Sequence, residues 1–323
     1  MSERVVLVTG GSGFIGRAVQ WRLLRDGMTH VRAATRRPVT DTPPGVDAVI
    51  VGGLEATTDW ATALRSVDVV VHTAARVHVM RERAMDPLAE FRRVNVAGTV
   101  ALGRQAAAAG VRRLVFLSSI KVNGEQTLTG RPYRPEDVPA PVDPYGVSKR
   151  EAEDGLRAIA SETGMEVVII RPVLVYGPGV KGNFRSMMHW LSKGVPLPLG
   201  AVHNQRSLVA LDNLVDLIAT GASHPSAANQ IFLVSDGEDV STTDLLRRTA
   251  AALGGSARLI PVPSPMVRAA CRLLGRADAA QRLCDSLQVD MSRTRELLGW
   301  SPPLRVDDAL RQTARDFLEQ RAG

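Results

Sequence analysis

The stretch Val5-Val-Leu-Val-Thr-Gly-Gly-Ser-Gly-Phe-Ile-Gly16 decides the fold class. It begins as an apolar strand and passes through a glycine-rich turn into a helix expected over residues 14–26. Glycines in such a turn allow the backbone to approach a pyrophosphate, whose charge lies at the helix N-terminus. The stretch therefore predicts a dinucleotide-binding unit with the cofactor against Gly10, Gly13, Phe14, Ile15 and Gly16.

The pattern of strand and helix continues to about Pro172. Apolar strands are expected at 30–35, 47–51, 68–73, 113–118 and 166–171, with helices at 60–66, 88–109 and 148–162. Continuous apolar strands that alternate with helices indicate an α/β protein, a doubly wound parallel sheet of the Rossmann type.

Beyond Pro172 glycine and proline become frequent and the elements shorter. Helices are expected at 214–219, 242–253, 264–274 and 306–318, and strands at 230–234 and 258–262. We therefore expect a dinucleotide-binding domain over 1–172 and a smaller C-terminal substrate-binding lobe over 173–323, with some segments of the lobe returning to the sheet.

Composition argues against a membrane-spanning, nucleic-acid-binding or metal-binding protein. The 323 residues are 45% hydrophobic, and no apolar run reaches the ~18 residues that would span a membrane. Despite a net charge of +7, no aromatic-interleaved basic stripe suggests nucleic acid. His72 and His78 lack metal-ligand spacing, and neither Cys271 nor Cys284 has redox spacing, so we expect no metal and a cytoplasmic location.

The end of the second strand bears on the choice of cofactor. A carboxylate there would bond the ribose of NAD, but Thr35 is followed by Arg36 and Arg37. Two guanidinium groups suit a 2′-phosphate, which favours NADP and leaves NAD possible. The small residues after the strand at 68–73, which are Thr73, Ala74 and Ala75, would leave room for the cofactor.

Three side chains suit proton transfer at an alcohol or ketone. Tyr145 and Lys149 are four residues apart, on one face of a helix, and an ammonium near a phenol favours the phenolate. Ser119 follows an apolar strand, at the sheet edge where ligands bind. Asn95 is a polar residue inside a long helix. It can be a core residue whose polar atoms are all hydrogen-bonded, and it can at the same time be a scaffold for this site.

Taken together, these motifs resemble the extended short-chain dehydrogenase/reductase family, in its branch of NAD-dependent epimerases and dehydratases that modify nucleotide sugars. The resemblance covers nearly the whole chain. It rests on residues 9–16, 72–75, 95–99, 118–119, 145–149, 171–178, 182–184, 206–216 and 297–300.

The resemblance implies roles for particular residues. Ser119, Tyr145 and Lys149 would be catalytic, with Lys149 lowering the pKa of Tyr145 and bonding the nicotinamide ribose. The cofactor would also contact Asn95 and Pro172. The substrate-binding residues would be Ser119, Lys121, Asn183, Arg206 and Arg282. The helices around Asn95 and Tyr145 would pair with their copies in a homodimer.

Departures from the family pattern leave the reaction open. Gly52-Gly53 stands where many relatives have Gly-Asp for the adenine, and no Asp-Glu pair follows Ser119, which argues against dehydration. Arg36 and Arg37 favour NADPH-dependent reduction of a UDP-4-keto-6-deoxy-N-acetylhexosamine, with Tyr145 as proton donor. The alternative is a UDP-hexose 4-epimerase with tightly bound NAD. The alternative that is not an enzyme is a redox sensor that binds NADP without catalysis.

Overall fold

A seven-stranded parallel sheet forms the centre of the computed structural model, which describes residues 4–28, 30–39, 42–77 and 85–322. Its order is β3-β2-β1-β4-β5-β6-β9. The strands are β1 (Val5–Thr9), β2 (His30–Thr35), β3 (Val46–Ile50), β4 (Val69–His72), β5 (Arg113–Leu117), β6 (Glu166–Pro172) and β9 (Ile231–Val234). The prediction of a doubly wound parallel sheet is confirmed.

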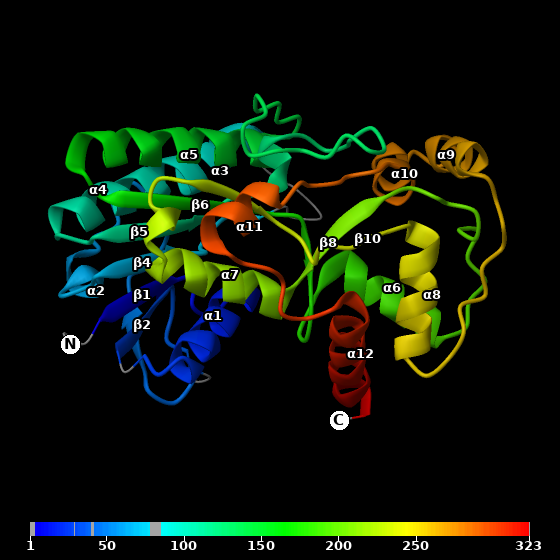
Figure 1. The fold of residues 1–323 in the computed structure, drawn as a ribbon, viewed down its shortest axis with the longest axis horizontal. Coiled ribbons are helices and arrows are strands. Elements are labelled where there is room, and N and C mark those ends of the chain that lie inside the picture. Colours follow the sequence, from blue (N-terminus) through cyan, green and yellow to red (C-terminus); the bar gives the residue numbers. More distant parts are fainter. Residues whose placement is uncertain (1–3, 29, 40–41, 78–84, 323) are drawn as a thin grey trace.

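Helices cover both faces of this sheet (Figure 1). One layer contains α1 (Phe14–Arg25) and α7 (Leu211–Ser223). The other contains α2 (Ala61–Leu64), α4 (Thr99–Ala108) and α5 (Pro144–Thr163). Alternate residues of β1 enter the two cores, with Val6 and Val8 on the α1 side and Leu7 on the α4 side. Burial on both faces explains why the strands are apolar throughout.

The helical stretch before α4 is not uniform. It runs through α3 (Pro87–Phe91) and a π-helical segment, η1 (Arg92–Gly98), before α4 begins. The sequence predicts one helix over 88–109 and does not reveal the π-helical segment. Such segments occur frequently at functional sites, and Asn95 lies in the middle of this one.

A smaller lobe extends from the carboxyl ends of the strands (Figure 1). It holds the three-stranded sheet β10-β8-β7 and two apolar cores of its own. Its elements are β7 (Leu174–Tyr176), α6 (Gly182–Ser192), β8 (Arg206–Ala210), β10 (Asp239–Val240), α8 (Thr242–Ala252), α9 (Ser264–Leu273), α10 (Ala277–Cys284) and α12 (Val306–Ala322). The short helices η2 (Ile120–Val122), η3 (Pro225–Ala227) and α11 (Ser292–Leu298) complete the chain. Although α7 and β9 follow residue 172 in the chain, β9 belongs to the large sheet and α7 packs on it. The domain boundary at residue 172 therefore stays a prediction.

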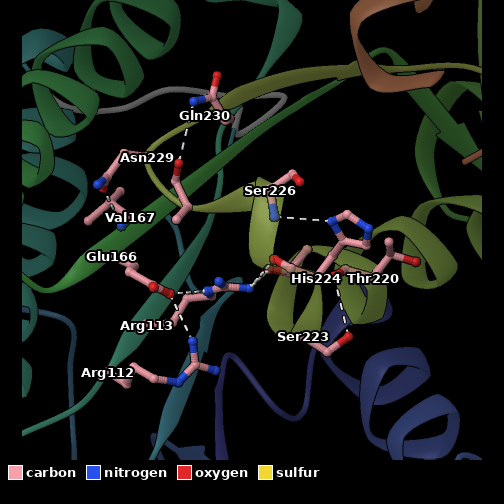
Figure 2. A network of polar contacts seen from close by, with 12 residues as sticks. Arg112, Arg113, Glu166, Val167, Thr220, Ser223, His224, Ser226, Asn229 and Gln230 are labelled. Carbon is pink, nitrogen blue, oxygen red and sulfur yellow. Dashed lines mark hydrogen bonds and ion pairs between the residues drawn. The ribbon is translucent and has the colours of Figure 1, made fainter. Parts of the chain in front are cut away.

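A buried arginine links β5, β6 and α7 at the end of the large sheet where β5 and β6 begin. Arg113, only 1% exposed, donates from Nε to Glu166 Oε2 at 2.6 Å, and from Nη1 to the carbonyls of Gly221 and His224 at 2.9 and 2.8 Å. Figure 2 shows this guanidinium between Glu166 and the C-terminal end of α7. A cation suits that position because the last carbonyls of a helix lack intrahelical partners.

Two further local predictions differ from the structure. The expected strand at 258–262 is wrong, since this segment makes only isolated bridges, such as Leu259 with Leu197. The helix expected from residue 148 begins earlier, at Pro144, because Asp143 caps it: its Oδ1 accepts from the Gly146 N–H at 2.6 Å. The earlier start places Tyr145 in the first turn of α5.

Candidate functional site

The glycine-rich loop lies where the strand order reverses, between β1 and β4. Gly10 has φ +68°, and a Cβ at Gly16 would lie 2.3 Å from the Gly10 carbonyl oxygen. The N-cap residue Gly13 makes no side-chain bond to the first turn of α1. The loop therefore has no room for side chains at these glycines. The N-terminus of α1 is left able to hold a pyrophosphate, as a dinucleotide cofactor requires.

Buried hydrogen bonds fix the loop against β4. Thr9 Oγ1 lies 2.6 Å from His72 Nδ1, and His72 Nε2 lies 2.9 Å from Thr99 Oγ1. Burial, aided by the charge of Lys149, lowers the pKa of His72 to about 3, so His72 is a neutral part of the scaffold. Thr73 donates to the Thr9 carbonyl at 2.7 Å. The predicted positions Thr73, Ala74 and Ala75 thus follow β4 beside the glycine loop.

Gln20 helps to fix the glycine-rich loop, a role that the sequence analysis does not predict. Its buried Nε2 donates to the carbonyls of Gly11 and Gly16, at 2.7 and 3.1 Å. A glutamine on the buried side of α1, four residues after Gly16, was the available signal. Its two bonds hold the loop in register with the helix.

Asn95 has a positioning role in this structure. Its Oδ1 accepts from the Arg76 N–H at 2.7 Å, and its Nδ2 donates to the Arg76 carbonyl and to Ser148 Oγ, at 3.0 and 3.1 Å. The side chain is 1% exposed. Its polar atoms thus hold the segment after β4 against α5, which supports the scaffold interpretation over direct contact with a cofactor.

Tyr145 and Lys149 lie at the end of β5. The Lys149 ammonium donates to the Leu117 carbonyl at 2.8 Å, two residues before Ser119. It lies 4.5 Å from the Phe116 ring centroid and 5.9 Å from that of Tyr145. The Tyr145 ring packs edge-on against Phe91 of α3. The three predicted catalytic residues therefore gather at the carboxyl end of β5.

The pKa values of this pair differ from the expectation. Burial raises the pKa of Tyr145 well above its usual value near 10, and the Asp143 carboxylate adds to the rise. Burial also lowers the pKa of Lys149 from 10.5 to about 7, against a smaller opposing effect of Glu153. The expected lowering of the Tyr145 pKa by Lys149 is therefore wrong for this structure, because desolvation favours both neutral forms.

A buried ion pair lies next to the Ser119 segment and contacts the neighbouring residue, Ser118. Arg171 and Glu153, 1% and 2% exposed in their side chains, lie 2.6 Å apart from Nη2 to Oε2. Glu153 also accepts from Ser118 Oγ at 2.5 Å, and Arg171 donates to Asn123 Oδ1 at 2.9 Å. This network joins β5, α5 and β6 beneath the candidate catalytic residues. The sequence signal for it was Glu153, four residues after Lys149 on the same helical face.

Lys121 lies beside the first turn of α5. Its ammonium pairs with Glu125 at 2.9 Å and with Asp143, the cap of that helix. Its own N–H donates to Ser119 Oγ at 3.3 Å. Lys121 thus links the Ser119 segment to the helix that carries Tyr145, with its charge balanced by two carboxylates.

The two arginines after β2 are exposed, and neither forms an ion pair within the described part of the chain. They follow the strand that neighbours β1, so Arg36 and Arg37 lie on the cofactor side of the sheet. Gly52 and Gly53 follow β3 at the same edge. This placement permits a contact with the adenosine half of a cofactor and does not distinguish NAD from NADP.

The predicted substrate residues of the lobe are spread over three elements. Asn183 is exposed near the start of α6. Arg206 begins β8 and donates to the Asp285 carbonyl at 3.0 Å. Arg282 is exposed on α10 and pairs with Asp278 at 2.6 Å. Pro172 is buried at the end of β6. A substrate role for Asn183, Arg206 and Arg282 stays a prediction, as does a cofactor contact at Pro172.

A cavity of about 650 Å³ has Arg171 of the buried ion pair in its wall, but Ser119, Tyr145 and Lys149 do not line it. Arg150 and Arg157 of α5, Val167 of β6 and Arg293 contribute to its walls, and none of the predicted site residues lines it. Among the described residues no group of three His, Cys, Asp or Glu side chains gathers as metal ligands would. A metal-independent reaction stays a prediction.

Comparison with known proteins identifies the family and supports the fold. The model of the NAD dependent epimerase/dehydratase family matches residues 6–235. A Vibrio cholerae protein named UDP-glucose 4-epimerase is 49% identical over 317 residues, covering 97% of this chain and 95% of the relative. The structure of UDP-N-acetylglucosamine 4-epimerase from Bacillus cereus superposes with a TM-score of 0.79 at 20% identity, covering 98% and 99% of the two chains. That of MoeE5 with UDP-glucuronic acid and NAD gives 0.77 at 25% identity, covering 99% and 100%.

Proposed function

The chain belongs to the NAD dependent epimerase/dehydratase family, and we propose that it is a 4-epimerase of UDP-linked hexoses that keeps one NAD bound throughout. The observation that carries the proposal is the 49% identity, over nearly the full length of both chains, to a protein named UDP-glucose 4-epimerase. The candidate catalytic residues Ser119, Tyr145 and Lys149 are all present and lie together.

The chain's own residues would handle the proton at the 4-hydroxyl. Tyr145 must be ionised to take this proton as C4 is oxidised, against the rise in its pKa caused by burial. It returns the proton as C4 is reduced, and Ser119 holds the same oxygen. A nicotinamide cofactor held at the glycine-rich loop would supply the hydride chemistry at C4, as acceptor in the oxidation and as donor in the reduction. With a pKa of about 7, Lys149 changes its charge at little cost near neutral pH, and each change alters the charge beside Tyr145.

We propose NAD as the cofactor, in place of the preference for NADP stated above. The family description names NAD, and one of the superposed structures holds NAD, whereas nothing in the comparisons favours NADP. The reductase reading loses its main support in consequence, because it depended on Arg36 and Arg37. The homodimer and the cytoplasmic location stay proposals.

The test is incubation of the purified protein, without added cofactor, with UDP-glucose and separately with UDP-N-acetylglucosamine. The proposal expects the corresponding C4 epimer, and Tyr145→Phe should abolish its formation while bound NAD is retained. Consumption of NADPH with a UDP-4-keto-6-deoxy sugar, and no epimer from either hexose, would establish the reductase instead. Equal turnover by Tyr145→Phe would remove Tyr145 from the mechanism.

A further inference from the structure

Helix α9 carries a second apolar face that the protein leaves uncovered. Its inner face packs Val267 into a core of the small lobe. Its outer face, which we call the α9 face, consists of Met266, Ala269, Ala270, Leu273 and Leu274. These positions follow the i, i+3, i+4, i+7, i+8 spacing of one helical stripe.

The exposure on the α9 face is large for such residues. Leu273 is 89% exposed, Leu274 77% and Met266 62%. Isolated apolar side chains on a surface are ordinary, but a contiguous exposed stripe marks an interaction site. α9 lies at the outer end of the small lobe, at the opposite end of the long axis from α4 (Figure 1).

Arginines predominate around the α9 face, and the acidic residues that follow it in the chain, Asp278 and Asp285, are paired with Arg282 and Arg268. Residues 254–277 contain four arginines and no aspartate or glutamate. Arg268 is engaged with Asp285 and with the Cys284 carbonyl. Arg272 and Arg276 are exposed beside the stripe and have no ion pair within the described ranges. An apolar stripe flanked by unpaired cations is the pattern of helices that bind at a membrane interface.

We propose that the α9 face binds the surface of a membrane that contains anionic lipids, with Leu273 and Leu274 inserted at the interface and Arg272 and Arg276 at the phosphate level. A second copy of the chain fits less well, since a two-fold contact would place the arginines of one copy against those of the other. A convex helix face also suits a lipid surface better than a peptide, which docks in a groove.

This association is peripheral. In the described part of the chain no helix is long and apolar enough to cross a bilayer, and the sequence prediction of no membrane partner considered only such a span. A site on the surface of the bilayer would revise that prediction without adding a spanning segment.

The experiment is co-sedimentation of the full chain with vesicles of phosphatidylcholine, with and without phosphatidylglycerol. Binding is expected only with phosphatidylglycerol present and should weaken as salt is raised, because the attraction is screened. Leu273→Ser/Leu274→Ser should lower the bound fraction at least about tenfold, because each leucine buried in the interface favours binding by about that factor.

Arg272→Ala/Arg276→Ala, which leaves the apolar stripe in place, should abolish the preference for phosphatidylglycerol. The matched control is Leu128→Ser/Val138→Ser, which removes two side chains that are 69% and 86% exposed elsewhere and should leave binding unchanged. Circular dichroism melting checks that each variant is folded.

Three outcomes would overturn the proposal. These are no binding to anionic vesicles by the unmodified protein, an equal loss of binding in the control, and self-association that only the Leu273/Leu274 variant loses while vesicles are not bound. The last outcome would assign the α9 face to a second copy.

Discussion

Replacing Lys149 by methionine should stabilise the protein while it abolishes turnover. The lysine is 2% exposed, and burial lowers its pKa from 10.5 to about 7. At about 1.4 kcal/mol per pH unit, holding the charged form in the folded protein costs ~5 kcal/mol below pH 7. Methionine fills a similar volume without that cost.

The net gain is smaller, because the substitution also removes favourable contacts. The Leu117 carbonyl loses its 2.8 Å bond to the ammonium, which costs about 1–3 kcal/mol if the oxygen stays unsatisfied. The cation also lies over the Phe116 ring, a contact that contributes about 1 kcal/mol. We therefore expect Lys149→Met to raise the free energy of unfolding by about 2 kcal/mol near pH 6.

The gain should depend on pH with a definite sign. Since the folded-state pKa of Lys149 lies below the unfolded value, the unfolded chain binds more protons between pH 7 and 10.5. The stability of the unmodified protein therefore rises with pH across this window, and the advantage of methionine shrinks. It should be largest below pH 7 and fall toward zero or reverse as pH 10.5 is approached.

The assay is urea unfolding of both proteins at about pH 6 and about pH 9.5, below the range in which Tyr145 ionises. Bound nucleotide is removed first, because a ligand that binds only the folded state adds to its stability. Lys181→Met, at an exposed position, serves as the control and should change little. A variant less stable at both pH values, or a gain that does not shrink at the higher pH, would refute the reasoning.

Three further experiments test the scaffold around the site. Glu153→Gln leaves the buried Arg171 charge uncompensated and should cost about 3–5 kcal/mol in urea unfolding; a loss below about 1 kcal/mol would contradict this burial argument. Gly16→Ala places a Cβ 2.3 Å from the Gly10 carbonyl oxygen and should abolish NAD binding measured by calorimetry, whereas unchanged affinity would mean that the loop yields. Lys121→Met leaves the Asp143 charge unbalanced beside Tyr145. The pKa of Tyr145 should rise, and because Tyr145 must be ionised to take the proton, the acidic limb of the pH–rate profile should move to higher pH. Adding Asp143→Asn, which keeps the helix cap, should move the limb back, and a profile that ignores both changes would exclude this coupling.

The sequence was most informative where local pattern determines structure. The first strand, the glycine turn and the following helix are set by neighbours in the chain, and the structure has them at Val5–Thr9 and Phe14–Arg25. The continuous apolar strands could likewise be read as a buried parallel sheet. Short strands such as β7 and β10 gave no such signal, because their pairing is decided by partners far away in the chain.

The electrostatics of the site depended on burial, which spacing does not reveal. The i, i+4 relation of Tyr145 and Lys149 placed them together, but the direction of their pKa values follows from desolvation. Likewise Glu153 meets Arg171 only because α5 packs on the end of β6. The chemistry of Arg36 and Arg37 suits a 2′-phosphate, but exposed arginines at a strand end are compatible with either cofactor.

The most direct test of the proposed epimerase follows the hydrogen at C4. UDP-glucose carrying deuterium at C4 is incubated with the purified protein and no added cofactor, and the product is examined by nuclear magnetic resonance and mass spectrometry. We predict UDP-galactose that retains the deuterium at C4, with no free NADH in the medium. Absence of the C4 epimer, or an epimer that has lost its deuterium, would contradict the account.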